Sequence, residues 1–448
     1  MSVRPRRPRT LRTAPSAPTL GDVPAPRPLQ ALPLPAVVDA EAVFLRLLAD
    51  RNAAFWLDAG TGATAGWSIL GTGRIEHDPT AVRSVLLDAA APEDDLPFRG
   101  GWVGWLSYEG EGAWIAVERA IAVDHATGRA FALAAEDEVD AWRAEVLAVV
   151  PTASAAPPAD PAPTSATARH GVDEYKKLVQ ECRAAIERGD AYQLCLTTRF
   201  TAPRPSDPLS VYRRLRAATP AHHGGFIRVG DRMLLSASPE QFLEVAGGVA
   251  RTSPIKGTRP RGAGAEEDAR LAAELQADPK ERAENVMIVD LMRNDLSHVG
   301  VPGTVDVERL WQVETYPAVH QLVSTVSVRL RKGTTVGDLV DAAFPAGSMT
   351  GAPKESAMGI LRRLEGARRG VYSGCFGHVG LDGGADLAMV IRSIVVERDH
   401  AYVGAGGGIT WLSKPDAEAA EVSVKARAPL AALGAGLPHE WAALLQSR

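Results

Sequence analysis

A stretch of proline, alanine and small polar residues at 151–169 divides the 448-residue chain into two unequal parts. This composition is typical of a semi-rigid surface linker and disfavours a packed helix or strand. It predicts an N-terminal region at 36–150, a larger domain at 170–435 and a short C-terminal tail at 436–448. The first 35 residues are rich in arginine and proline, and we expect them to form a disordered tail.

Charge and cysteine content exclude several classes of protein. The net charge of −5 gives no general attraction to nucleic acid or to anionic membranes. The chain contains no apolar run of about 18 residues, so no membrane span is expected. Its three cysteines are odd in number and far apart, which argues against a disulfide framework or a thiolate metal site. We therefore expect a globular protein of the reducing cytoplasm.

Strand and helix patterns occur on both sides of the linker. Apolar and polar residues alternate at 191–198, as in a half-buried strand, and 53–58 and 233–238 are also expected to be strands. Apolar residues recur at helical spacing at 175–186, and a second helix is expected at 279–296. The pattern predicts a mixture of strands and helices.

The segment Pro-Ile-Lys-Gly-Thr at 254–258 follows a predicted strand, which its proline and glycine should end. Lys256 is therefore expected at a strand end or in a tight loop, where catalytic groups are common. A lysine acts as a nucleophile only when neutral, and from an ordinary pKa this costs roughly 4–5 kcal/mol at pH 7. On these residues alone, a solvated lysine is the more frequent case.

Two pairs of glutamates lie on predicted helices. Glu281 and Glu284 are three residues apart and share one helix face, and Glu418 and Glu421 have the same spacing on a later helix. Like-charged pairs usually mark solvated faces. If the two pairs converge, four carboxylates need a cation, and an all-oxygen shell selects Mg²⁺ over zinc.

Other segments are suited to anions or to proton transfer. The segment at 347–354 runs from a loop into a helix, whose free N-terminal amides favour a carboxylate. The glycine run at 404–408 can bring backbone N–H groups against a ligand. Arg392 interrupts an apolar strand and needs an anionic partner. Glu240 follows a strand and is either a surface group or a general acid.

Together these segments resemble, in order, the motifs of the chorismate-utilising enzymes over about residues 172–433, and most closely those of the aminodeoxychorismate synthase component I branch. The N-terminal part is similar more loosely. The resemblance implies an α+β fold, with two large antiparallel β-sheets packed face to face and helices outside. It also implies that 36–150 is an anthranilate synthase component I-like region and that 170–435 is the chorismate-binding catalytic domain. The similar motifs lie at 55–58, 101–109, 238–243, 254–262, 282–295, 347–354 and 404–409.

The resemblance also implies a site. Lys256 would be the nucleophile, and Glu240 would be the general acid. Chorismate would lie in a buried cleft with its ring carboxylate on Mg²⁺, and Tyr372 and Arg392 would hold its enolpyruvyl carboxylate. The implied metal site consists of Glu284 and Glu421, with Glu281 and Glu418 beside them. The implied substrate contacts are Gln193, Gly257, Thr258, Ser348, Tyr372, Arg392, Gly406, Gly407, Gly408 and Lys425.

Two positions separate the activities within the family. Anthranilate synthases usually have alanine where this chain has Lys256. Isochorismate and salicylate synthases activate water with a lysine at the position of Gln193, and an amide cannot serve as that base. The resemblance thus implies two displacements, in which Lys256 adds at C2 of chorismate and ammonia then attacks C4. Because no Gly-x-Cys-x-Gly elbow is present, ammonia is expected from a separate glutamine amidotransferase.

Some residues depart from the family pattern. Gln321 stands where anthranilate synthases have histidine, with His320 one residue earlier, and His378 stands where relatives often have tyrosine. Anthranilate synthase component I and a non-catalytic chorismate-binding subunit are the alternative readings. The sequence also leaves two pathways open for the product, 4-aminobenzoate for folate or a secondary metabolite.

Overall fold

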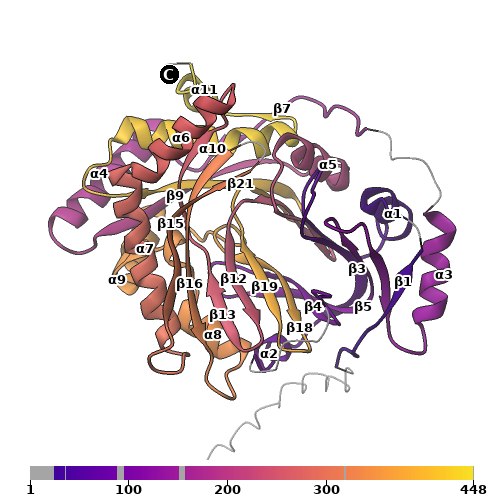
Figure 1. The fold of residues 1–448 in the computed structure, drawn as a ribbon. Coiled ribbons are helices and arrows are strands. Elements are labelled where there is room, and N and C mark those ends of the chain that lie inside the picture. Colours follow the sequence, from indigo (N-terminus) through magenta and orange to yellow (C-terminus); the bar gives the residue numbers. More distant parts are fainter. Residues whose placement is uncertain (1–24, 36, 88–94, 151–156, 317–318, 447–448) are drawn as a thin grey trace, which may run out of the picture.

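The computed structural model describes residues 25–35, 37–87, 95–150, 157–316 and 319–446. Within these ranges, 20 strands are joined by hydrogen bonds into one antiparallel network, with helices around it (Figure 1). The expected α+β class is confirmed. None of the helices in the described ranges is both long enough and apolar enough to span a membrane.

The 13-residue strand β5 (Gly112–Asp124) joins two arms of this network. Its first half pairs with β4 (Gly101–Leu106) and its second half with β6 (Ala130–Ala134) on the same edge, while β3 (Trp67–Glu76) occupies the other edge. The resemblance implied two sheets. They are continuous here because β5 is long enough to belong to both.

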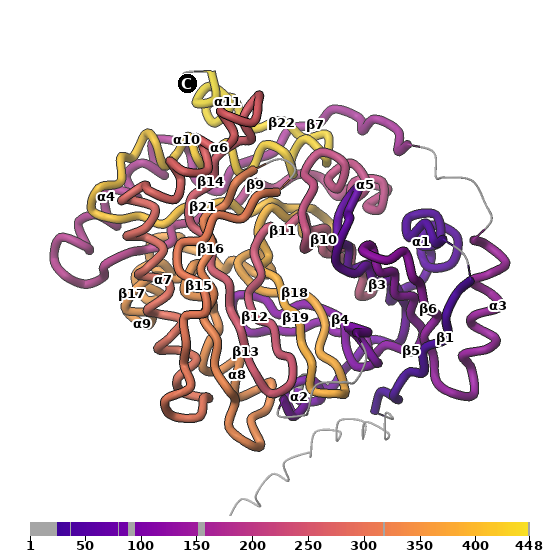
Figure 2. The backbone as a smooth tube through the Cα atoms, in the orientation of Figure 1, coloured from indigo at the N-terminus to yellow at the C-terminus, as the bar shows by residue number. Residues whose placement is uncertain are grey.

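The remaining strands extend the two arms, and most of them are labelled along the backbone in Figure 2. The first arm continues from β3 through β2 (Ala53–Asp58), β10 (His223–Val229), β11 (Arg232–Ser238), β20 (Ser393–Val396), β21 (His400–Ile409) and β9 (Gln193–Pro203). The second arm continues from β4 through β18 (Cys375–Gly380), β19 (Ala385–Met389), β12 (Gln241–Ala246), β13 (Val249–Thr252) and β16 (Val319–Arg329). Strand β16 also pairs with β14 (Ile255–Pro260) and β15 (Asp306–Thr315), and β9 also pairs with β17 (Gly351–Ala352).

Three apolar clusters hold these layers together. One cluster lies between the two arms and includes Phe55, Trp105 and Phe376, so the arms pack face to face as expected. A second lies under helices on the first arm, α1 (Ala40–Leu47), α3 (Val139–Val149), α4 (Val172–Glu187), α5 (Pro208–Ala218), α9 (Lys354–Glu365) and α10 (Pro415–Ala432). The third lies under α2 (Pro79–Arg83), α7 (Pro279–Ser297) and α8 (Val336–Ala343) on the second arm. Helix α6 (Ala265–Ala277) packs on β14, β15 and β16.

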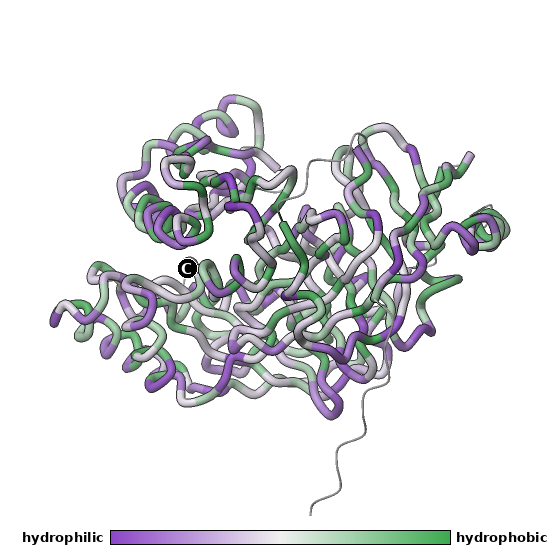
Figure 3. Tube along the Cα trace, turned by 90° about the horizontal axis from the view of Figure 1, so that it is seen from below, coloured by the Kyte–Doolittle hydropathy of each residue, from purple (hydrophilic) through white to green (hydrophobic). Residues whose placement is uncertain are grey.

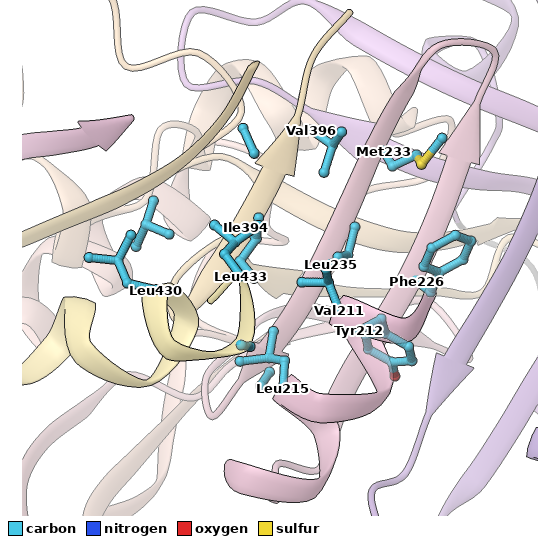
Figure 4. Packing of buried hydrophobic residues seen from close by; sticks show 14 of the residues in the cluster. Val211, Tyr212, Leu215, Phe226, Met233, Leu235, Ile394, Val396, Leu430 and Leu433 are labelled. Atoms are coloured by element: carbon cyan, nitrogen blue, oxygen red, sulfur yellow. The ribbon is translucent and has the colours of Figure 1, made fainter. Parts of the chain in front are cut away.

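Hydropathy follows this layering. Hydrophobic segments concentrate in the central strands, while hydrophilic segments are frequent along peripheral helices and turns (Figure 3). Leu215 of α5 and Leu430 of α10 point toward Leu235 and Ile394, which lie on strands β11 and β20 (Figure 4). Helices α5 and α10 therefore close the outer face of the first arm.

Residues near both ends and within the linker are more ordered than expected. Strand β1 (Gln30–Leu34) pairs with β6, so the predicted disordered tail is too long, although 1–24 lie outside the described residues. Within 157–169, β7 (Thr164–Ser165) pairs with β22 (Ala435–Gly436), and β8 (Thr167–Ala168) pairs with β9. Linker residues 151–156 lie outside the described ranges. Backbone pairing therefore orders segments whose composition is typical of linkers.

The predicted C-terminal tail also contains a packed helix, α11 (His439–Ala443). Trp441 is fully buried, and its indole Nε1 donates a hydrogen bond to the carbonyl of His170 at 3.2 Å. Burial of this aromatic ring explains why the segment does not behave as a tail. The division into 36–150 and 170–435 stays a prediction, and β2 and β4 of the first part pair directly with β10 and β18 of the second.

Candidate active site

Lys256 lies on β14, where its ammonium faces an acidic helix. Its Nζ is 3.9 Å from Oε2 of Glu284 on α7. On the other side lies Gly408 of β21: a Cβ there would come within 3.3 Å of Lys256 Nζ and 2.6 Å of Gln193 Nε2. A lysine from the second arm therefore meets a glycine and an amide from the first.

The backbone around Lys256 is irregular. The register between β14 and β16 shifts between Ile255 and Thr258, and Gly257 has a φ of 82°. A Cβ at Gly257 would come within 2.9 Å of Leu275 and 3.0 Å of Glu281, so a larger residue would push α6 and α7 away. Lys256 was expected at a strand end or in a tight loop. It lies instead within β14, which begins after a short break at 253–254 and continues through Gly257.

Gln193 is the first residue of β9, and its side chain is buried. Among the described residues, neither its Oε1 nor its Nε2 has a hydrogen-bond partner. A buried polar group without a partner costs about 1–3 kcal/mol. Because this amide lies beside Lys256, a bound ligand is the natural source of the missing hydrogen bonds.

Glu240 lies between β11 and β12 and is only 7% exposed. Burial raises the pKa of its carboxyl to about 7, while the Ser348 hydroxyl and the ammonium groups of Lys256 and Lys425 act in the opposite direction. Ser348 belongs to the short 3₁₀ helix η1 (Gly347–Met349). A carboxyl with this pKa carries a proton in a substantial fraction of molecules at neutral pH, as a general acid must.

The two predicted glutamate pairs converge at the first two turns of α7 and α10. Lys280 Nζ is 3.5 Å from Glu284 Oε1, and its charge also acts on Glu281 and Glu418. Burial, and then repulsion from Glu284, raises the pKa of Glu281. Burial and the neighbouring Glu421 raise the pKa of Glu418, against a hydrogen bond from Ser413. The carboxylates are therefore crowded enough to favour a cation.

The chemistry of this donor set fits Mg²⁺. All four groups are carboxylates, which a hard cation prefers over the nitrogen and sulfur ligands of zinc. In the described ranges, no three His, Cys, Asp or Glu side chains stand in a geometry that would hold a metal. Lys256 and Lys280 supply the nearby positive charge instead.

The glycine run of β21 places backbone beside charged groups. Lys425 on α10 donates from Nζ to the carbonyl of Gly406 at 2.8 Å and pairs with Glu421 Oε1 at 2.7 Å. A Cβ at Gly407 would come within 3.0 Å of Glu418 Oε2. The expected backbone contacts at 406–408 therefore lie next to the expected metal ligands.

Arg392 lies between β19 and β20 with a φ of 52°, an unusual conformation for a residue with a side chain. Burial lowers the pKa of its guanidinium, and the neighbouring Tyr372 and Glu421 side chains oppose this effect. No ion pair or side-chain hydrogen bond of Arg392 is present within the described ranges. A cation in this setting fits an anionic ligand.

The structure brings together most of the predicted site residues. Thr258 is the exception because it is exposed, and it pairs across the strands with Gln321. The ring of His320 contacts Asp268 at 2.9 Å and Thr315 at 2.9 Å. His320 is thus bound to other partners. This agrees with the expectation that it does not substitute for the histidine that anthranilate synthases have at the position of Gln321.

Sequence reasoning missed a polar network behind Lys256. Asn285 on α7 donates from Nδ2 to the carbonyl of Pro254 at 3.4 Å, and its Oδ1 accepts from Ser324 Oγ at 2.6 Å. A signal was present, since Asn285 shares the buried helix face of Ile288 and Met292. A polar residue on such a face indicates a buried partner.

The chorismate binding enzyme family matches residues 43–431, which is most of the chain. The chain belongs to this family. The resemblance seen in the sequence is thus confirmed at the level of the family, and the match begins within the N-terminal region.

The chain is similar to two curated relatives and to one solved structure, and these proteins carry two different enzyme names. Aminodeoxychorismate synthase of Streptomyces pristinaespiralis is 40% identical over 89% of this chain and 64% of the relative, so the chain spans just under two thirds of that protein. Anthranilate synthase component 1 of Streptomyces coelicolor is 38% identical over 88% of this chain and 86% of the relative. Anthranilate synthase component I from Streptococcus pneumoniae is 27% identical with a TM-score of 0.71, covering 89% of this chain and 98% of that structure.

Proposed function

We propose that this chorismate binding enzyme converts chorismate and ammonia to 4-amino-4-deoxychorismate. The observation that supports this reaction is the position of Lys256, which faces Glu284, Gly408 and the unpartnered Gln193 amide, in one site with the protonatable Glu240. Ammonia would come from glutamine through a separate amidotransferase subunit. Because the similar proteins include an anthranilate synthase component 1 as well as an aminodeoxychorismate synthase, anthranilate synthase is the alternative function.

The first displacement would use Lys256 and Glu240. The neutral Lys256 amine forms a C–N bond at C2 of chorismate, the two ring double bonds shift, and the C4–O bond breaks. Glu240 gives its proton to the departing hydroxyl, which leaves as water. A covalent nucleophile thereby divides one difficult substitution into two easier ones.

The second displacement would reverse the first with ammonia. Ammonia forms a C–N bond at C4, the double bonds shift back, and Lys256 leaves C2 as a neutral amine. A proton from the new C4 ammonium returns to Glu240. The sum is chorismate plus ammonia giving 4-amino-4-deoxychorismate plus water, with the enolpyruvyl group retained.

The remaining residues would bind and orient. Glu284 and Glu421, with Glu281 and Glu418 beside them, would hold a magnesium ion, which when bound supplies positive charge for the ring carboxylate. Tyr372 and Arg392 would take the enolpyruvyl carboxylate. Contacts from Gln193, Gly257, Ser348, Lys425 and the backbone at 406–408 would fix the ring.

Removing divalent metal with a chelator is expected to abolish turnover, and adding Mg²⁺ should restore it. Mg²⁺ should also raise the midpoint of thermal unfolding, because it relieves repulsion among the carboxylates. Glu284→Gln and Glu421→Gln should each raise the Mg²⁺ concentration needed for half of this stabilisation by at least about tenfold. Asp290→Asn, on the exposed side of α7, is the matched control and should respond like the parent. Full activity after chelation would show that the reaction does not need a divalent metal.

Product identification tests the proposed reaction directly. Purified protein with chorismate, Mg²⁺ and ammonium is expected to yield 4-amino-4-deoxychorismate, detected by chromatography with mass spectrometry. Added aminodeoxychorismate lyase should convert it to 4-aminobenzoate. Anthranilate as the main product would assign the alternative activity, and chorismate binding without turnover would indicate a non-catalytic subunit.

The cellular setting is part of the proposal. Three free, buried cysteines are consistent with a reducing compartment, and we propose the cytoplasm. The product would serve 4-aminobenzoate and folate synthesis, or a related secondary pathway.

A further inference from the structure

A buried ion pair at the end of α9 lies next to the candidate site without belonging to it. Arg369 and Glu365 are each only 3% exposed. Arg369 Nη2 donates to Glu365 Oε1 at 2.7 Å, and Nε donates to Oε2 at 2.8 Å. The proximity of Glu365 outweighs the effect of burial, so the pKa of Arg369 is raised and the guanidinium stays charged.

The guanidinium also holds two backbone carbonyls. Nη1 donates to Met349 at 2.6 Å, and Nη2 donates to Cys195 at 2.7 Å. Met349 follows Ser348 in η1, and Cys195 lies opposite Gly408 in the β9–β21 pair. The Arg369 side chain therefore fixes η1, whose Ser348 contacts Glu240, and it also fixes β9, which pairs with the glycine run of β21.

Glu365 anchors this arrangement from the other side. Its Oε1 accepts hydrogen bonds from the backbone N–H and the hydroxyl of Thr197, both at 2.9 Å. Thr197 pairs with Gly406 across the strands. The ring of Tyr108 lies 4.4 Å from the Arg369 guanidinium. The pair is thus held rigidly between β9, α9 and the turn after β4.

We propose that Arg369 is a positioning residue that holds Ser348 against Glu240, through the Met349 carbonyl, during amination of chorismate. This inference rests on the proposed function. A purely structural ion pair is the alternative, but buried pairs contribute little net stability. Arg369 also donates to the carbonyls of Met349 and Cys195, which belong to two segments of the site, and this favours a role in positioning those segments.

Arg369→Lys is the first test because lysine keeps the charge beside Glu365. A single ammonium cannot reach the carboxylate and both carbonyls, since it lacks the planar fork of arginine. We expect kcat to fall at least about tenfold and KM for chorismate to change less than about threefold. Arg368→Lys is the matched control, because the neighbouring Arg368 side chain is 60% exposed, and it should retain the parent kcat.

The pH profile gives a readout that a structural role alone would not move. Ser348 lowers the pKa of Glu240, together with Lys256 and Lys425, which are unchanged in the variant. Loss of the Ser348 contact should therefore move the alkaline limb of kcat to higher pH in Arg369→Lys. Arg368→Lys should keep the parent limb.

Backbone amide hydrogen exchange tests the positioning role of Arg369 independently of the proposed function. The N–H of Cys195 donates to Thr350, and that of Thr350 donates to Gly347. These amides should exchange faster in Arg369→Lys than in the parent or in Arg368→Lys, whatever product the enzyme makes. A folded Arg369→Lys with parental kcat, pH profile and exchange would overturn the inference.

If Arg369→Lys does not accumulate as folded protein, Arg369→Ala with added guanidinium decides the matter. Arg369 and Glu365 line a surface cavity of about 760 Å³, through which a small cation can enter. Millimolar guanidinium chloride should raise kcat of this variant at least about tenfold over sodium chloride at equal ionic strength. An Arg369→Ala protein that binds chorismate but shows no such rescue contradicts the inference.

Discussion

Lys256→Ala is expected to reduce ammonia-dependent amination of chorismate on the order of 10³-fold or more, because the covalent route is lost. The affinity for chorismate should change far less, since Gln193, Arg392 and the backbone at 406–408 remain. Steady-state product formation and equilibrium chorismate binding measure the two effects. In the parent, rapid acid quench followed by peptide mass spectrometry should find Lys256 with the added mass of chorismate minus water.

Lys280→Ala is the matched control for loss of positive charge. Lys280 and Lys256 pair with opposite oxygens of the same Glu284 carboxylate, at 3.5 Å and 3.9 Å. Lys280→Ala should therefore show any effect of the missing charge while keeping the nucleophile. If Lys256→Ala retains the parent rate, direct attack by ammonia suffices, and the covalent role is wrong even where the product is as proposed.

Glu240→Gln is expected to lower kcat by about 10²–10⁴-fold, the usual contribution of a general acid. In the parent, Glu240 must be protonated to act, so kcat should fall as pH rises through about 7. The residual activity of Glu240→Gln should lack this limb. A parental alkaline limb in the variant would show that another group supplies the proton.

The same substitution should affect stability in the opposite direction. Glu240 ionises near pH 4.5 when unfolded and near 7 when folded, so folding takes up a proton between these values. The free energy of unfolding of the parent should therefore decrease as pH rises from 4.5 to 7, by on the order of 3 kcal/mol. Glu240→Gln lacks this loss and should be the more stable protein at pH 8. Urea unfolding at pH 5 and pH 8 measures the difference.

Sequence motifs predicted which residues lie together at the candidate site, whereas the arrangement of the strands and helices around them depends on distant pairings. Lys256 and the two glutamate pairs could be identified because short motifs determine their local placement, and the family resemblance supplied their order. The convergence of Glu284 and Glu418 could not be derived from helical spacing, because it depends on how α7 and α10 are placed by different arms.

Composition misled where backbone pairing or a single aromatic residue decides the structure. Strand β1 and the short strands within 157–169 lie in proline-rich segments, yet each finds a partner strand. Arg369 was overlooked for another reason. A Glu-to-Arg spacing of four residues at a helix end usually indicates an exposed surface pair, and only the fold shows that Glu365 and Arg369 are buried.

The long strand β5 has a consequence for biosynthesis of the chain. It connects β3, which leads to β10, with β4, whose partner β18 lies about 270 residues later in the sequence. During synthesis, β2 therefore has an unpaired edge until β10 is made, and β4 has one until most of the polypeptide has been made. Such distant pairings fold slowly and expose edges that invite aggregation. A fragment that begins after the linker would carry the same liability permanently, because β10 and β18 would each lose a neighbour.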